Sequence, residues 1–95
     1  MSERLDLAAA ALREKIEGSG FQGSVGFDMG EDGFIRVQDE EVTTGSGPTD
    51  CTITAPMDVF REMFEGNLDP TKAFMTGRLR IDGSMGVAMQ LARVL

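Results

Sequence analysis

The closing segment of the chain, residues 85–95, constrains the fold most, because its sequence MGVAMQLARVL has helical spacing but almost no polar side. Its apolar residues cover both sides of such a helix: Met85, Ala88, Met89, Ala92 and Leu95 on one, and Val87, Leu91 and Val94 on the other. A helix that is apolar nearly all round must be buried on both of its sides. One side can pack on a sheet, and the second requires another helix, a partner chain or a ligand.

The rest of the chain alternates between helical and period-two patterns. Helical spacing of apolar residues predicts helices over 3–17, 56–65 and 70–76, and alternation predicts strands near 24–29, 34–38, 41–45, 50–55 and 78–82. Asp69 and Ser84 are suited to cap the last two helices. We expect an α+β fold in which four strands form a meander, the fifth returns after a helical crossover, and helices lie on one face of a mixed sheet.

Length and composition limit the classes of function. At 95 residues, the chain (1–95) is expected to be a single domain. Residues 66–95 carry four basic and two acidic side chains, whereas the first 65 residues carry 5 and 14, and the net charge is −7. This balance argues against nucleic acid as a partner, and the near-balanced charges of the first helix predict weak or no stable membrane association.

The side chains that are missing exclude further chemistry. Without histidine, neither a Ser-His nor a Cys-His nucleophile system nor a histidine zinc site is available, so we predict no metal and no cofactor, and only carboxylate chemistry stays open. The single cysteine, Cys51, and an N-terminus that resembles no targeting signal favour a cytoplasmic location. A small enzyme acting through carboxylates is the least favoured reading.

Several spaced motifs in residues 50–95 occur together: DCTIT, F-x-x-M-F-x-G-N-L-D-P, A-F-M-T-G-R-L-R-I-D-G and M-G-V-A-M-Q-L. This half of the chain resembles the sterol carrier protein type 2 (sterol-transfer) domain, and the N-terminal half agrees with that family in the order of its elements. The resemblance implies a five-stranded mixed sheet covered on one face by helices. It also implies an apolar tunnel between sheet and helices that accepts a sterol, fatty acid, fatty acyl-CoA or phospholipid, and no catalysis.

The resemblance also suggests which residues line such a tunnel. The positions that match tunnel-forming elements are Phe60, Met63, Phe64, Phe74, Met75, Leu79, Ile81, Met85, Met89 and Leu95, and alternation adds Val25, Phe27, Ile35 and Val37 from the strands. Each of these apolar side chains could equally fill the core. Gln90 could meet a lipid headgroup or face water, and Arg78 and Arg80 could attract an anionic group or belong to a solvated surface.

Two readings of the closing helix therefore remain open. In the first, it closes over a lipid that the protein carries or transfers inside the cell. In the second, it is the interface of a non-catalytic accessory domain that meets a partner chain or forms a homodimer.

Overall fold

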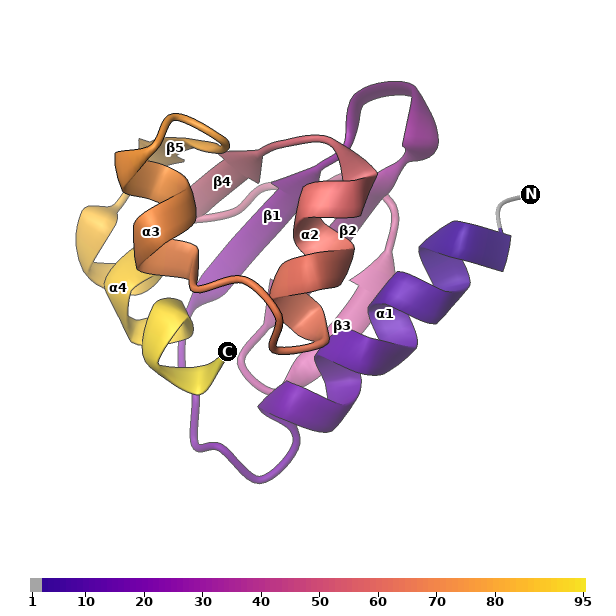
Figure 1. Cartoon of the computed structure of the whole chain (residues 1–95). Helices are drawn as coiled ribbons and strands as arrows, with labels where there is room; N and C mark the ends of the chain where they lie inside the picture. The colour runs from indigo at the N-terminus through magenta and orange to yellow at the C-terminus, as the bar shows by residue number, and fades with distance from the viewer. Residues whose placement is uncertain (1–2) are drawn as a thin grey trace.

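The protein is described here by a computed structural model, which covers residues 3–95 (Figure 1). It shows the predicted α+β fold, with a five-stranded mixed sheet and four α-helices. In chain order the elements are α1 (Glu3–Ile16), β1 (Ser24–Asp28), the 3-10 turn η1 (Gly30–Asp32), β2 (Phe34–Gln38), β3 (Glu41–Thr44), β4 (Cys51–Thr54), α2 (Met57–Phe64), α3 (Pro70–Met75), β5 (Arg80–Gly83) and α4 (Met85–Val94).

The strand order of the sheet is β3-β2-β1-β4-β5. β1, β2 and β3 form an antiparallel meander, β4 pairs with β1 in parallel, and β5 pairs with β4 antiparallel. The prediction of a four-stranded meander is therefore wrong. The loop 45–50 carries the chain past β2 and β1. At the end of this loop, the Asp50 N–H donates a hydrogen bond to the Ser24 hydroxyl at 2.7 Å. Alternation identifies which face a strand buries, but it does not specify the strand's neighbour.

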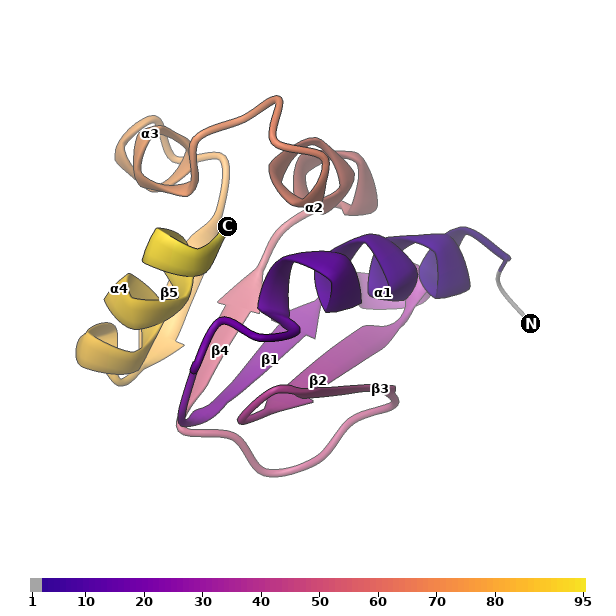
Figure 2. The same ribbon diagram turned by 90° about the horizontal axis from the view of Figure 1, so that it is seen from below.

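The helices lie on one face of the sheet (Figure 2). Helices α1 and α2 cover the half formed by β1, β2 and β3, where Leu12 and Ile16 of α1 are fully buried. At the centre, the ring of Phe27 meets the rings of Phe60 and Phe64 edge-on, at centroid distances of 5.2 and 5.3 Å. Edge-to-face rings at this spacing pack favourably, so these three residues form the centre of the core.

Helices α3 and α4 lie toward the other half of the sheet and begin at the predicted caps. The Asp69 side chain accepts a hydrogen bond from the Thr71 N–H at 2.8 Å, and the Ser84 hydroxyl accepts one from the Val87 N–H at 3.3 Å. Pro70 occupies the first turn of α3, where its missing N–H costs no helical hydrogen bond. These caps fix the residues at which α3 and α4 start. The starting points in turn help to set the space between the two helices.

A tight turn joins β5 to α4. Gly83 pairs with Cys51 across the sheet and has φ +101°, a conformation that strongly favours glycine. The next residue, Ser84, donates its N–H to the Asp50 carbonyl at 2.9 Å. The turn therefore ties the start of α4 directly to the beginning of β4.

Candidate functional site

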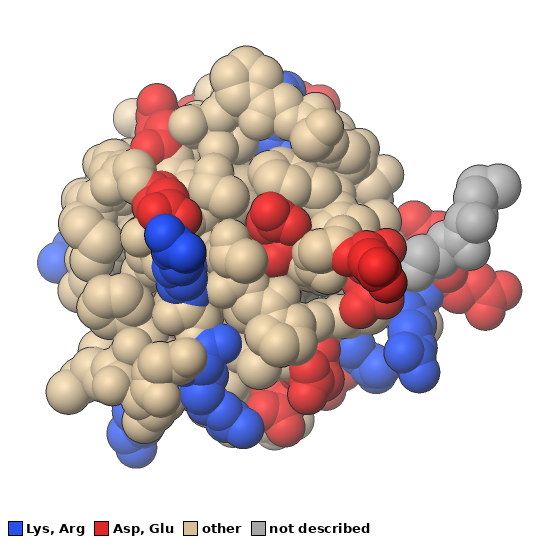
Figure 3. Space-filling model, turned by 90° about the horizontal axis from the view of Figure 1, so that it is seen from above, with Lys and Arg blue, Asp and Glu red and all other residues tan. Residues whose placement is uncertain are grey.

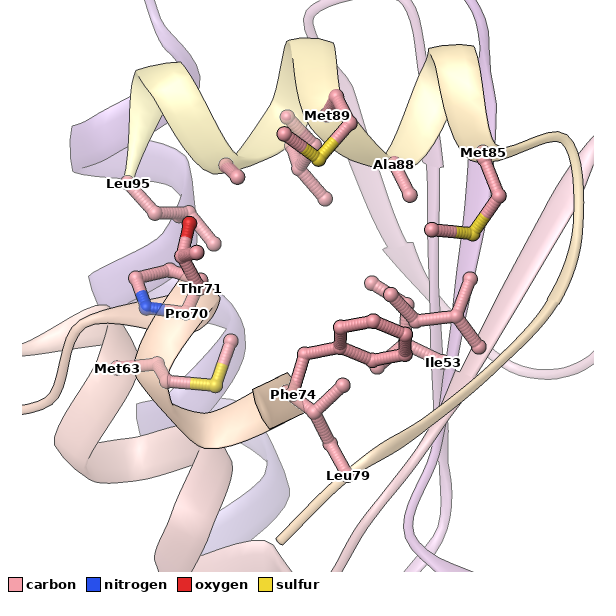
Figure 4. A pocket seen from close by; sticks show the side chains of 13 residues that line it. Ile53, Met63, Pro70, Thr71, Phe74, Leu79, Met85, Ala88, Met89 and Leu95 are labelled. Carbon is pink, nitrogen blue, oxygen red and sulfur yellow. The ribbon is translucent and has the colours of Figure 1, made fainter. Parts of the chain in front are cut away.

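An apolar groove lies between α3, α4 and the β4–β5 side of the sheet (Figure 4). Thirteen residues line it: Ile53, Met63, Pro70, Thr71, Phe74, Leu79, Ile81, Met85, Ala88, Met89, Leu91, Ala92 and Leu95. Figure 4 shows Pro70, Thr71 and Leu95 at one end, Met85 and Ile53 at the other, and the Phe74 ring between them. The free volume inside is about 60 Å³.

The side chains that line the groove are nearly all apolar, which suits the hydrocarbon part of a ligand. Thr71 contributes the one polar side chain among the described lining residues. Met63, Met85 and Met89 contribute flexible thioethers, which adapt their shape to irregular apolar guests. A site of this composition recognises apolar area and shape.

The groove opens to solvent through large apolar side chains. Phe74, Met85 and Met89 are 43%, 44% and 47% exposed, although each contributes to the lining. Exposed large apolar side chains that cluster around one opening indicate a surface that binds something apolar. The side of α4 that faces the groove is therefore only partly covered by the protein itself.

A polar recess adjoins one end of this groove. It shares Met63, Pro70, Ala92 and Leu95 with the groove and adds Lys15, Gly66, Asn67, Leu68, Asp69 and Lys72, and its volume is about 630 Å³. The apolar groove and the polar recess thus adjoin one another, with these four residues between them.

Comparison with known proteins decides the family. The sequence model of the SCP-2 sterol transfer family matches residues 2–95. The chain belongs to this family.

Relatives and solved structures of the SCP-2 family agree with that assignment. Hydroxysteroid dehydrogenase-like protein 2 of Xenopus tropicalis is 41% identical over 66 residues, which is 65% of this chain but 16% of that protein. This chain therefore spans a small part of the relative's length. Among solved structures, sterol carrier protein 2 like 2 of Aedes aegypti has a TM-score of 0.80 at 14% identity, covering 97% of this chain and 96% of that one. Sterol carrier protein 2 of Aedes aegypti in complex with palmitate has a TM-score of 0.75 at 15% identity, covering 98% and 94%.

Seven of the residues predicted to line the SCP-2 tunnel lie around the groove. They are Met63, Phe74, Leu79, Ile81, Met85, Met89 and Leu95. They come from α2, α3, β5 and α4, and from Leu79 just before β5 and Leu95 just after α4. Segments separated by more than 30 residues therefore meet at one opening.

The other predicted residues lie elsewhere. Val25, Phe27, Ile35, Val37, Phe60 and Phe64 are 0–1% exposed and belong to the core between the sheet and the helices, outside the groove. Alternation correctly places the strand residues on the helix-covered face, but that face has two halves, and packed helices fill one of them. Met75 is 78% exposed and does not line the groove, because it follows Phe74 around the helix and points away. Gln90 is also exposed and lies outside both spaces.

Six lining residues are additional to those predicted: Ile53, Pro70, Thr71, Ala88, Leu91 and Ala92. Ala88 and Ala92 share the helical face of Met85 and Met89, so the spacing was a sufficient signal for them. Ile53 follows from alternation in β4. Thr71 had no such signal, because a polar residue in the first turn of a short helix is usually solvated.

The charges of the SCP-2 domain are dispersed over the face shown in Figure 3. Basic side chains are scattered there among acidic and uncharged ones, so this face presents no extended basic surface. No helix within residues 3–95 has both the length and the apolar content needed to cross a bilayer.

Cys51 provides a test of the packing on the helix-covered face. Its side chain is 1% exposed, and burial raises the pKa of its thiol, with the carboxylates of Asp82 and Asp50 adding to the effect. The reactive form is the thiolate, so we expect a disulfide reagent at about pH 8 to label the folded protein far more slowly than the unfolded one. Ellman's reagent with and without guanidinium checks this, and fast labelling of the folded protein would show that the face is open.

Proposed function

We propose that the protein binds the hydrocarbon part of a lipid in the groove between α3, α4 and the sheet, for intracellular carriage or transfer. The observation that carries the proposal is an apolar groove whose mouth is formed by half-exposed Phe74, Met85 and Met89. The SCP-2 family model and the palmitate complex of the Aedes aegypti protein support the same class of cargo. The proposed role is binding without catalysis.

The energy available from such a groove is sufficient. Each methylene group removed from water contributes about 0.8 kcal/mol. A chain of about 12 carbons therefore gains roughly 9 kcal/mol before the costs of ordering it and the protein are subtracted. A dissociation constant in the micromolar range follows if those costs are modest, because about 8 kcal/mol corresponds to 1 μM.

The groove must widen to accept a lipid. A free volume of about 60 Å³ is far too small to enclose a long acyl chain. We propose that α4 moves outward and that the methionines along the groove change rotamer, since Met85 and Met89 are 44% and 47% exposed and are therefore less closely packed than the core residues. In this view, the predicted tunnel is a property of the loaded form.

The alternative is an interface with a second protein chain. The exposed Met85 and Met89 on α4 are its specific support, because two such side chains one turn apart are typical of a helix that packs on a partner. Native mass spectrometry separates the two readings. Lipid that copurifies at one molecule per chain supports cargo binding, and a lipid-free dimer supports the interface.

Filling the groove tests the proposal directly. Met89→Trp places a large ring at the mouth. We expect it to weaken the binding of a fluorescent fatty acid by at least about tenfold, which corresponds to about 1.4 kcal/mol. The matched control is Met75→Trp, on an exposed site outside the groove. It should bind as the wild type does. Equal weakening by both variants, or a wild type that binds no probe, would contradict the proposal.

A further inference from the structure

The polar recess at the end of the groove indicates what kind of head the cargo carries. We propose that the ligand is an anionic amphiphile, with its carboxylate or phosphate head between Lys15 and Lys72 and its tail in the groove. This inference rests on the proposed function and adds to it the charge of the head and the direction in which the molecule lies.

Lys15 places an ammonium group inside the recess. It belongs to the last turn of α1 and is partly buried. A Cβ built on Gly66 would lie 3.5 Å from the Lys15 Nζ, so the ammonium lies close over the loop that follows α2. No carboxylate of the described residues forms an ion pair with it. Its charge is therefore available to a ligand.

Lys72 faces the same recess from α3 and likewise forms no ion pair within residues 3–95. The one acidic side chain in the recess, Asp69, is engaged in capping α3, with its Oδ1 accepting from the Thr71 N–H. Among the side chains that line the recess, two lysines stand against one aspartate, in a chain whose net charge is −7. This excess of basic side chains favours an anionic group in the recess.

The polarity of the groove sets the orientation. Its polar side chain, Thr71, lies at the end next to the recess, beside Pro70 and Leu95, which line both spaces (Figure 4). The opposite end is formed by Ile53 and Met85 (Figure 4). A head bound by Lys15 and Lys72 therefore leaves the tail to run past Phe74 toward the sheet.

A series of ligands with identical tails tests the inference on the unmodified protein. Dodecanoate, dodecyl phosphate, dodecanol and dodecyltrimethylammonium, each below its micellar concentration, are compared by displacement of a fluorescent fatty acid near neutral pH. We expect the two anions to bind about three- to tenfold more tightly than dodecanol, and the cation to bind most weakly. The preference should shrink as salt is added, because partly exposed charges are screened.

Variants identify the lysines responsible. Lys15→Gln/Lys72→Gln should reduce the affinity for dodecanoate to that for dodecanol and leave the affinity for dodecanol unchanged. The matched control, Arg78→Gln/Arg93→Gln, removes the same charge from exposed residues outside the groove and recess, and should keep the preference.

The outcomes separate this inference from the proposed function. Equal binding of dodecanoate and dodecanol by the wild type overturns the anionic head and leaves lipid binding standing. A preference that survives in the lysine double variant also overturns it. Binding of none of the four ligands removes the proposed function itself. Circular dichroism of each variant confirms that the fold is retained before affinities are compared.

Discussion

Phe27→Ala is expected to leave the protein close to unfolding. Phe27 is fully buried in β1 and packs edge-on against both Phe60 and Phe64. Removing a buried phenylalanine costs about 3–5 kcal/mol, and a domain of this size has roughly 5–15 kcal/mol in total. We expect the melting temperature to fall by about 15–30 °C. Thermal and urea unfolding followed by circular dichroism measure the loss.

Phe74→Ala is the matched control for that result. Phe74 is 43% exposed and belongs to the groove, so its removal should cost less than about 1 kcal/mol of stability while weakening lipid binding. Because both variants remove a phenylalanine, their comparison distinguishes a core position from a position in the groove. If Phe27→Ala were as stable as Phe74→Ala, the assignment of Phe27 to the core would be wrong.

Gly83→Ala is expected to have the second large effect, and to act on both stability and binding. At φ +101°, an alanine is strained, and its Cβ would lie 2.5 Å from the Asp50 carbonyl oxygen. That oxygen accepts the hydrogen bond from Ser84 that anchors α4, so the backbone must shift at the point where α4 begins. We expect a loss of about 3 kcal/mol together with weakened binding, because α4 forms one wall of the groove.

Gly77→Ala isolates the effect of the contact. Gly77 has φ +76° but nothing lies within 4 Å of the Cβ position, so the cost should be near the backbone strain alone, about 1 kcal/mol. Urea unfolding of both variants gives the difference, and the fluorescent probe reports binding. Equal stability of the two variants would show that the β5–α4 turn adapts freely.

The sequence allowed the class of fold and the order of its elements to be predicted, because each element carries its own signals. Pro70 and Asp69 mark the start of α3, Ser84 the start of α4, and alternation marks the strands. The position of β4 was not predictable in this way. Whether β4 lies beside β3 or beside β1 depends on the path of loop 45–50 across the sheet, and its Gly, Ser and Pro residues suit either path.

The candidate site was predictable only in part, for a related reason. Periodicity separates buried from exposed faces, but it does not separate a buried face packed by the protein from one left for a guest. Phe60 and Met63 lie on the same face of α2, yet the first packs on Phe27 and the second lines the groove. That division depends on where α3 and α4 lie relative to α2, which the spacing of apolar residues within α2 does not specify. The recess formed by Lys15 and Lys72 likewise brings together side chains 57 positions apart.

The small volume of the empty groove also fixes how its affinity can be tuned. If the open form is a minor population of the ligand-free protein, the measured dissociation constant is the intrinsic one divided by that population. An equilibrium with about 1% open molecules thus weakens apparent binding roughly 100-fold. Smaller side chains at Met85 would then tighten binding by favouring the open population, even where they remove contacts with the guest. Evolution can therefore adjust how tightly a ligand is held by changing the stability of the closed form as well as the contacts with the ligand.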